Sequence, residues 1–227
     1  RVKLGVRTDS ADSEGCEIAR CEDFDISRKQ IEKSLQNFRG EIDQVPPMHS
    51  ALKVTGVPLY KMARKGETIE RKARRVTIYS IELTEFEGDE LELKIACSKG
   101  TYIRTIADDL GQLLGCGAHI IALRRTQAGA FTEADCVTTK QLREESERDG
   151  VSAIDAHLIP MDQAIAYLPE VELPSITASF IKNGQPVLVR HLPAEGLVRL
   201  YEEGQFIGIG CIDDDGKVAP RRLIVTQ

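Results

Sequence analysis

Two neighbouring segments with alternating apolar and polar residues constrain the fold of this 227-residue chain more than any other feature. Residues 74–86 and 90–97 both alternate, and only Glu87-Gly88-Asp89 separates them. Alternation with a period of two places every second side chain on one face of a sheet, so the pair predicts an antiparallel hairpin. An amphipathic helix is predicted directly after it, because the apolar residues there repeat with helical spacing. This stripe consists of Ile103, Ile106, Ala107, Leu110 and Leu114.

The other segments predict an α+β order rather than a regular alternation of strands and helices. The chain opens as a strand, and a capping box of Ser27 and Gln30 predicts a helix that stops before Gly40. A short helix is expected from Pro58 to Gly66, and a charged surface helix at 139–149. Beyond the prolines at 160–174, the sequence is typical of a small β module. Its expected strands lie near residues 171–173, 197–201, 205–212 and 218–225.

Composition excludes several classes of protein. No stretch approaches the roughly 18 apolar residues of a membrane span, and no secretory signal pattern opens the chain, so a soluble cytoplasmic protein is predicted. The six cysteines form no C-x-x-C pair and the four histidines do not cluster with them, so neither a metal site nor a disulfide framework is expected. The chain begins at Arg1 without an initiator Met, and we expect the start of the protein to be missing.

Positive charge is segregated within an acidic chain. The whole sequence carries a net charge of −6, yet residues 53–75 hold eight basic and two acidic side chains, or +6. Such a basic segment is typical of contact with phosphates or another polyanion. The alternative for a charge run taken alone is a solvated helical face.

The stretch from Lys99 to Gly111 joins a predicted strand to a predicted helix. Gly100 allows the turn, and residues at such a junction project from a rigid scaffold. Tyr102 offers a flat ring, and Arg104 offers a permanent charge that can hold a carboxylate with two hydrogen bonds. The structural alternative is an ordinary surface pair of Arg104 with Asp108, four residues later on the helix.

Four motifs lie in series along the chain. They are Leu4-Gly5-x-Arg7-Thr8-Asp9-x-x-Asp12-x-x-Gly15, Pro46-Pro47-x-x-Ser50-Ala51-x-Lys53, Cys97-Ser98-Lys99-Gly100-Thr101-Tyr102-Ile103-Arg104, and Gly115-Cys116-Gly117-Ala118-His119 with Leu123-Arg124-Arg125. Together these motifs strongly resemble the bacterial TruB family of tRNA pseudouridine synthases. The C-terminal part, with Lys182-Asn183-Gly184 and Val218-Ala219-Pro220-Arg221-Arg222, looks like the PUA-related RNA-binding module of this family. The resemblance covers essentially the whole chain in the right order.

The resemblance implies a fold and a domain plan. The fold is α+β, a mainly antiparallel mixed sheet with flanking helices in an incomplete pseudouridine synthase fold, followed by a small PUA-like β module. Residues 1–165 would be the C-terminal portion of the catalytic domain, with an RNA-gripping insertion at about 47–75. Residues 166–227 would be the PUA-like module.

The resemblance also implies an activity, the isomerisation of the T-loop uridine at tRNA position 55 by base flipping and an aspartate nucleophile. Arg104 matches the arginine that pairs with that aspartate, and Tyr102 matches the tyrosine that packs on the target base. Leu123 matches an apolar wall of the substrate pocket. The family needs no metal and no organic cofactor for this reaction.

The implied partner is the T-stem-loop of tRNA, with no membrane and no protein partner required, so a monomer is expected. The insertion would bind the RNA phosphates. His49 falls where the family often has an aromatic residue, and stacking on RNA and a plain surface role are equally open for it. The residues expected to bind RNA are His49, Lys53, Lys61, Arg64, Lys65, Arg74 and Arg75.

One departure from the family concerns the nucleophile. The family's aspartate lies in an Asp-Pro motif upstream of the Leu-Gly-x-Arg-Thr-Asp element, and no Asp-Pro occurs in these 227 residues. We therefore expect residues 1–227 alone to make no pseudouridine, and a chain extended upstream to make it. The alternatives are a non-catalytic RNA-binding or tRNA-folding protein, and a small acidic enzyme unrelated to RNA.

Overall fold

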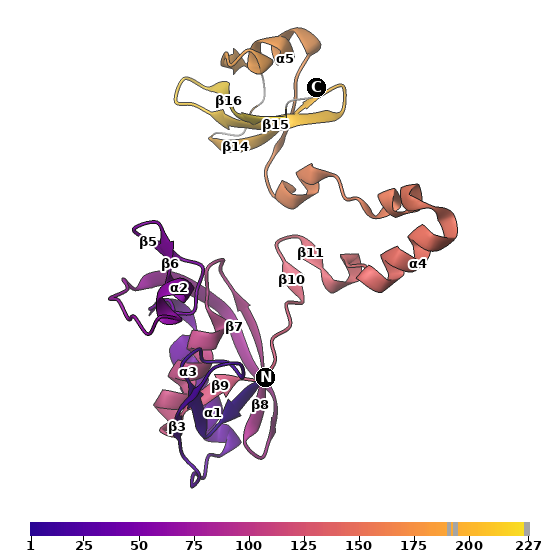
Figure 1. The fold of residues 1–227 in the computed structure, drawn as a ribbon. Coiled ribbons are helices and arrows are strands. Elements are labelled where there is room, and N and C mark those ends of the chain that lie inside the picture. Colours follow the sequence, from indigo (N-terminus) through magenta and orange to yellow (C-terminus); the bar gives the residue numbers. More distant parts are fainter. Residues whose placement is uncertain (190–191, 193–194, 225–227) are drawn as a thin grey trace. The chain divides into compact units, whose positions relative to one another are not determined.

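The computed structural model describes residues 1–189, 192 and 195–224, and it forms two compact units, Arg1–Arg124 and Arg125–Gln227 (Figure 1). Each unit contains its own cluster of buried apolar side chains. The architecture is the predicted mixture of mainly antiparallel sheets and a few helices. The domain boundary expected near residue 165 lies inside the second unit and stays a prediction.

The first unit is built on a five-stranded antiparallel sheet. Its strands, in spatial order, are β4 (Gly40–Gln44), β7 (Arg74–Glu87), β8 (Glu90–Cys97), β1 (Val2–Leu4) and β9 (Ala118–Ile120). The predicted hairpin is confirmed, because β7 and β8 pair from Glu87↔Glu90 to Ile78↔Cys97. The edge strand β4 was not predicted, and it sets the position of the candidate site described below.

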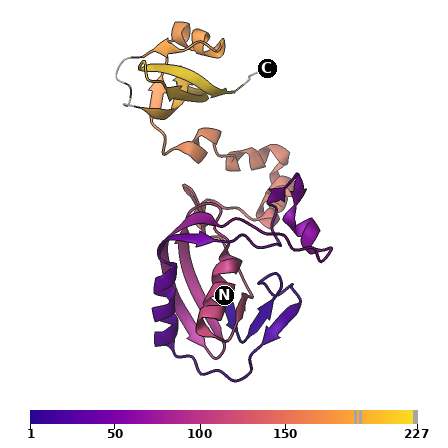
Figure 2. The same cartoon turned by 90° about the vertical axis from the view of Figure 1, so that its left-hand side faces the viewer.

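Two helices bury their apolar faces against this sheet (Figure 2). Helix α1 (Arg28–Leu35) begins with the predicted capping box of Ser27 and Gln30 and continues as the 3-10 turn η1 (Gln36–Phe38). Helix α3 (Ile103–Leu114) ends at Gly115, whose φ of 82° suits a residue without a Cβ. The buried core of this unit comprises Val2, Leu4, Ile31, Leu35, Phe38, Ile78, Ile81, Leu91, Ile106, Ala107, Leu110, Cys116, Ala118 and Ile120.

Short elements complete the first unit. Strands β2 (Val6–Thr8) and β3 (Glu17–Arg20) pair across the polar loop between them. The basic segment contains the hairpin β5 (Lys53–Val54) and β6 (Val57–Pro58), followed by α2 (Leu59–Ala63). Helix α2 is shorter than predicted, because the residues up to Gly66 form hydrogen-bonded turns onto Met62 and Ala63 instead of a further helical turn.

Gly111 is required by the contact between α3 and β9. A Cβ at this position would lie 2.1 Å from the backbone nitrogen of Ala118 and 2.4 Å from the carbonyl carbon of Gly117. Gly to Ala normally stabilises a helix interior by about 1 kcal/mol, but here the clash is with backbone that cannot rotate away. We therefore expect Gly111→Ala to lower the free energy of unfolding of this unit by about 1–3 kcal/mol in urea titrations.

The control for that substitution is Leu113→Ala on the same helix, because the Leu113 side chain is 52% exposed. It should change the free energy of unfolding by less than about 0.5 kcal/mol. A Gly111→Ala variant at least as stable as the parent would contradict the close packing of α3 on β9.

The second unit opens with the pair β10 (Gln127–Ala128) and β11 (Phe131–Thr132) and the 3-10 turn η2 (Glu133–Asp135). Helix α4 (Thr139–Asp149) has the predicted bounds, and the 3-10 segments η3 (Val151–His157) and η4 (Met161–Ile165) follow it. Neither 3-10 segment was predicted, because neither has a sustained apolar period.

The β module of this unit is a five-stranded sheet covered by α5 (Ser175–Lys182), a helix that was not predicted. Its strands, in spatial order, are β12 (Glu170–Glu172), β14 (Gly196–Glu202), β15 (Gln205–Ile212), β16 (Lys217–Leu223) and β13 (Val187–Leu188). Residue 225, the predicted end of the last strand, lies outside the described residues. The Asp213 to Gly216 turn joins β15 to β16 as predicted.

Within the described ranges, no helix is long and apolar enough to cross a membrane. No group of three or more histidine, cysteine or acidic side chains is placed to hold a metal ion in this part of the chain.

Candidate active site

Gln44, the last residue of β4, fixes the start of α3. Its side-chain amide accepts a hydrogen bond from the Tyr102 amide at 2.8 Å and donates one to the Tyr102 carbonyl at 3.1 Å. Gln44 is only 3% exposed, so this two-way contact is shielded from water. The contact holds the backbone from which the side chains of Tyr102 and Arg104 project.

Arg104, in the first turn of α3, binds three acceptors from two distant loops. Nη1 donates to the Asp12 carboxylate at 2.9 Å and to the Ser10 carbonyl at 3.4 Å, and Nη2 donates to the His49 carbonyl at 2.7 Å. About a quarter of the Arg104 and Asp12 side chains is exposed. The guanidinium is therefore held in one orientation at a partly open position.

Asp12 is held as a carboxylate in a tight loop. Burial opposes its ionisation, but hydrogen bonds from the Ser10 hydroxyl, the Glu14 amide and Arg104 outweigh that effect, so the pKa of Asp12 lies below its usual value. The loop is closed by Thr8, whose hydroxyl donates to the Asp12 carbonyl at 2.7 Å. Ala11 has a φ of 58°, a left-handed conformation unusual for a residue with a side chain. Such backbone strain is typical of functional sites.

The alternative pairing of Arg104 with Asp108 is wrong. Asp108 instead accepts two hydrogen bonds from Arg7, at 2.7 and 3.0 Å, and a third from Gln112 at 2.9 Å. The hydrogen bonds to the Asp108 carboxylate raise the pKa of the Arg7 guanidinium above its usual value. Asp108 is therefore the partner of Arg7, and the Arg104 guanidinium contacts Asp12 and the His49 carbonyl instead.

The structure brings His49 to Arg104 through its backbone carbonyl. The half-buried Tyr102 is the N-cap residue of α3. Leu123 follows β9, and its side chain is 64% exposed. No ligand contact tests these three assignments, so they stay predictions.

The basic side chains predicted to bind RNA are all exposed. Lys53 lies in β5 and Lys61 in α2. Arg64 ends α2 and stacks over the Tyr60 ring at 5.5 Å from its centroid. Lys65 follows in the turn after α2 and Arg74 begins β7.

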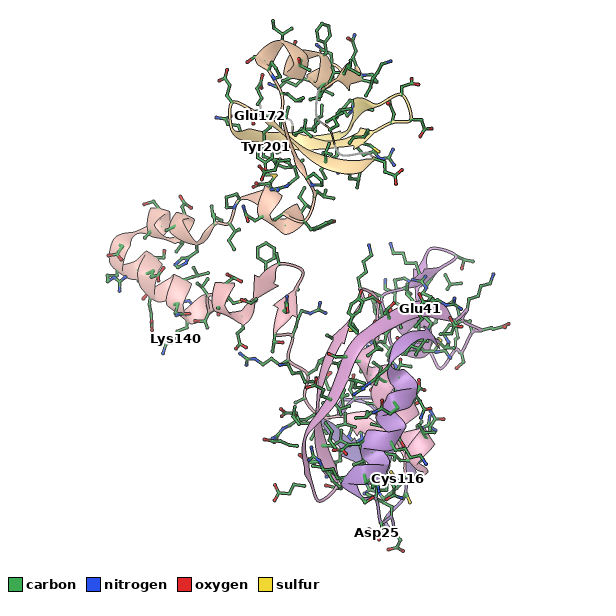
Figure 3. The ribbon with its side chains drawn as sticks, turned by 180° about the vertical axis from the view of Figure 1, so that it is seen from behind. Asp25, Glu41, Cys116, Lys140, Glu172 and Tyr201 are labelled. Atoms are coloured by element: carbon green, nitrogen blue, oxygen red, sulfur yellow. The ribbon has the colours of Figure 1, made fainter. Side chains whose placement is uncertain are left out.

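Arg75 differs from the other predicted RNA contacts because acidic side chains on β4 partly neutralise it. Its guanidinium lies 3.3 Å from Asp43 and 3.9 Å from Glu41, which Figure 3 labels. The exposed pairs raise the pKa of Arg75. Arg75 therefore adds less uncompensated positive charge to the basic segment than the lysines and the arginine of residues 53–65 do.

Comparison with family models matches the chain along nearly its whole length. Residues 1–103 match the N-terminal domain of the TruB family of pseudouridylate synthases. Residues 104–166 match the C-terminal domain of tRNA pseudouridylate synthase B, and residues 169–224 match the C-terminal region of pseudouridine synthase II TruB.

Curated relatives are similar at about half of the aligned positions. A protein of Tolumonas auensis named tRNA pseudouridine synthase B is 51% identical over 98% of this chain and 71% of its own length. Proteins with the same name from Yersinia pestis and Aliivibrio salmonicida are 49% and 48% identical over 99% of this chain, and over 71% and 73% of their own lengths.

Solved structures are similar in fold. A chain of a Cbf5-Nop10-Gar1 complex aligns with a TM-score of 0.69 at 23% identity, covering 98% of this chain and 65% of its own length. A chain of an H/ACA RNP bound to a substrate RNA containing 2′-deoxyuridine aligns with a TM-score of 0.68 at 20% identity, covering 99% and 65%. The family models and the curated relatives show that the chain belongs to the TruB family of pseudouridylate synthases.

Proposed function

We propose that this protein is a tRNA pseudouridine synthase that isomerises the T-loop uridine, with Arg104 and Tyr102 at the reacting base and ribose. The observation that carries the proposal is the Arg104 guanidinium, held by Asp12, Ser10 and His49 in a chain about half identical to proteins named tRNA pseudouridine synthase B.

The chemistry sets three requirements for the site. The bond between N1 of uracil and C1′ of the ribose breaks, the base turns, a bond forms from C5 to C1′, and the proton on C5 leaves to solvent while N1 gains one. Since the reaction is an isomerisation, its atoms balance without a co-reactant. The enzyme must therefore extract the base from the loop, hold the ribose, and supply an ionised nucleophile.

Arg104 meets the last requirement by holding a carboxylate ionised. A guanidinium has five N–H donors, and the three acceptors in this site use three of them. The remaining donors suit the nucleophilic aspartate that the family places upstream of Arg1. A fixed positive charge beside that carboxylate favours its ionised form and orients it.

Tyr102 and Leu123 would contact the extracted base. Gln44 fixes the backbone of Tyr102, so the ring can stack on uracil with little loss of conformational entropy. Leu123 would form the apolar wall against which the extracted base packs, because its side chain is exposed and free to contact a ligand.

The RNA partner would be the tRNA T-stem-loop, bound by the insertion at 47–75. We assign RNA contact to the basic segment and to His49, and further tRNA contact to a PUA-like module at 166–227 that follows a catalytic portion at 1–165. A monomer acting in the bacterial cytoplasm is sufficient for this reaction.

Release of tritium from C5 tests the proposed reaction. A T-stem-loop labelled with tritium at C5 of its uridines should release one equivalent to water per RNA when mixed with the protein extended upstream to include the aspartate motif. RNA binding without release of tritium would favour the non-catalytic RNA-binding alternative.

Replacing Lys61, Arg64 and Lys65 together by Gln tests the basic segment. Each phosphate contacted on looped RNA contributes about −0.7 to the slope of log affinity against log salt. If most of the three side chains contact phosphates, the triple variant should bind a T-stem-loop more weakly and flatten that slope by roughly two units. Fluorescence anisotropy at several salt concentrations measures both quantities.

A charge-matched control separates contact from net charge. Replacing Lys140, Arg143 and Arg148 of α4 by Gln removes the same charge from a different exposed surface. We expect only a small change in affinity, which salt screens. An unchanged slope in the Lys61, Arg64 and Lys65 variant, or an equal change in the control, would remove phosphate contact from the basic segment.

A further inference from the structure

Four side-chain polar atoms in the described part of the chain are buried without a hydrogen-bond partner: Nδ1 of His49, Oγ of Ser50, Nε of Arg71 and Oγ1 of Thr105. Buried polar atoms in proteins are nearly always paired, so unpaired ones need an explanation.

Three of the four belong to His49, whose carbonyl binds Arg104, or to the residues that follow His49 and Arg104 in the chain. Arg104 donates to the carbonyl of His49, and Ser50 is the next residue in that loop. Thr105 follows Arg104 on α3, and Arg71 donates through Nη1 to the Pro46 carbonyl at the start of the same loop. Unpaired polar atoms therefore lie on both segments joined by the hydrogen bond from Arg104 to His49, which favours a polar ligand for the loop that contains Ser50.

Ser50 is the most restricted of the four. It is 5% exposed, its amide donates to the Met48 carbonyl at 2.9 Å, and its carbonyl accepts from the Tyr60 amide at 3.0 Å. The backbone on both sides of the hydroxyl is therefore fixed while the hydroxyl itself is unsatisfied. The hydroxyl is thus the one polar group of Ser50 without a hydrogen-bond partner in the described structure.

The charges around Ser50 indicate which ligand would satisfy it. Asp12 already offsets the charge of Arg104, whereas the loop containing Ser50 runs into the basic segment with Lys53 and Lys61. A neutral O–H donor in a loop that leads into a basic segment suits an anionic oxygen, which has further lone pairs for cationic side chains of that segment. In RNA, that oxygen belongs to a backbone phosphate.

We propose that Ser50 is a substrate-binding residue whose hydroxyl donates to one of the two phosphates that flank the target uridine. This inference rests on the proposed function, since those phosphates are the ones attached to the ribose on which the Arg104 site acts. The hydroxyl is covered in the ligand-free protein, so RNA binding shifts the loop around Met48 and Ala51 locally. The contact then holds the ribose while the base turns.

The test compares Ser50→Ala with the parent in the protein extended upstream to include the aspartate motif. Single-turnover rates at subsaturating T-stem-loop should fall about 10- to 100-fold, the rate equivalent of one hydrogen bond to a charged group. The urea midpoint of the free protein should stay equal or rise, because an unsatisfied buried hydroxyl is removed. Ser80→Ala in β7, at a half-buried position of the same unit, is the control for removal of a serine hydroxyl and should leave the rate unchanged.

Uncharged methylphosphonates at the two flanking positions identify the phosphate. At one of the two positions, the methylphosphonate should lower the reaction rate of the parent about 10-fold or more. The same RNA should lower the rate of Ser50→Ala by clearly less. Any of three results would overturn the proposal. The first is a Ser50→Ala rate within twofold of the parent, and the second is a lower urea midpoint of Ser50→Ala, which would reveal a hydrogen-bond partner of the hydroxyl inside the protein. The third is an equal loss of rate in both proteins with the methylphosphonate RNAs. Affinities for the same RNAs decide the Ser50 contact even if no pseudouridine forms, an outcome that would contradict the proposed function alone.

Discussion

Arg104→Ala and Arg104→Lys should each lower the single-turnover rate of pseudouridine formation at least about 100-fold in the protein that carries the upstream aspartate motif. Alanine removes the charge, and lysine keeps the charge but loses the planar fork that reaches Asp12 and the His49 carbonyl together. Affinity for the T-stem-loop should change much less, because most of the proposed contacts to RNA phosphates come from the basic segment. Rapid-quench measurements with saturating enzyme separate the two quantities.

The matched control is Arg28→Ala on α1. Arg28 forms an exposed pair with Glu32 at i, i+4, which is the arrangement that a surface role for Arg104 would have required. Such pairs contribute only a few tenths of a kcal/mol, so the rate should remain within twofold of the parent. A well-folded Arg104→Ala variant with a rate within the same twofold range would remove Arg104 from the active site.

Arg199→Met should lower the free energy of unfolding of the C-terminal β module by about 3–5 kcal/mol. The Arg199 side chain in β14 is 8% exposed and donates to Glu170 at 2.8 Å, to the Leu168 carbonyl at 2.9 Å and to the Tyr201 hydroxyl at 2.9 Å. Tyr201, labelled in Figure 3, in turn donates to Asp162 at 2.6 Å. Methionine fills the volume but leaves the Asp162 carboxylate, which is 13% exposed, without a cationic neighbour.

Hydrogen exchange resolved by segment measures this effect, because the chain has two units that need not unfold together. Amides of β14 to β16 should exchange faster by the factor that corresponds to the lost stability. Lys217→Met breaks an exposed ion pair with Asp215 at 3.9 Å. It should change the free energy of unfolding obtained from the exchange rates by less than about 1 kcal/mol. Equal exchange in the Arg199→Met variant and the parent would contradict a structural role for the buried network.

Locally encoded elements were predictable from the sequence. The hairpin of β7 and β8, the capped helix α1 and the helix α3 with its Gly115 stop follow from periodicity and capping residues that lie next to one another in the chain. The strands of the β module were found for the same reason. Helix α5 was not predicted because, unlike the equally short α1, it has no capping side chain at its start, where Pro174 precedes it.

The candidate site was only partly predictable, because its contacts join segments far apart in the sequence. Arg104 and Tyr102 were identified through the family motif, whereas Asp12 was noticed only as part of a motif and Gln44 not at all. The Gln44 contact depends on the pairing of β4 with β7, which no local pattern near Gln44 indicates. The false alternative for Arg104 arose because helical spacing made Asp108 the nearest acid in sequence, while the fold gives that acid to Arg7.

As a tRNA pseudouridine synthase, this protein is expected to act on one uridine of the T-loop. The most direct test maps pseudouridine in a full tRNA transcript by carbodiimide modification and reverse transcription, after incubation with the protein extended upstream to include the aspartate motif. The account predicts one reverse-transcription stop, at the T-loop uridine, that disappears when this uridine is replaced by cytidine. A transcript without any stop, or with stops only outside the T-loop, would contradict it.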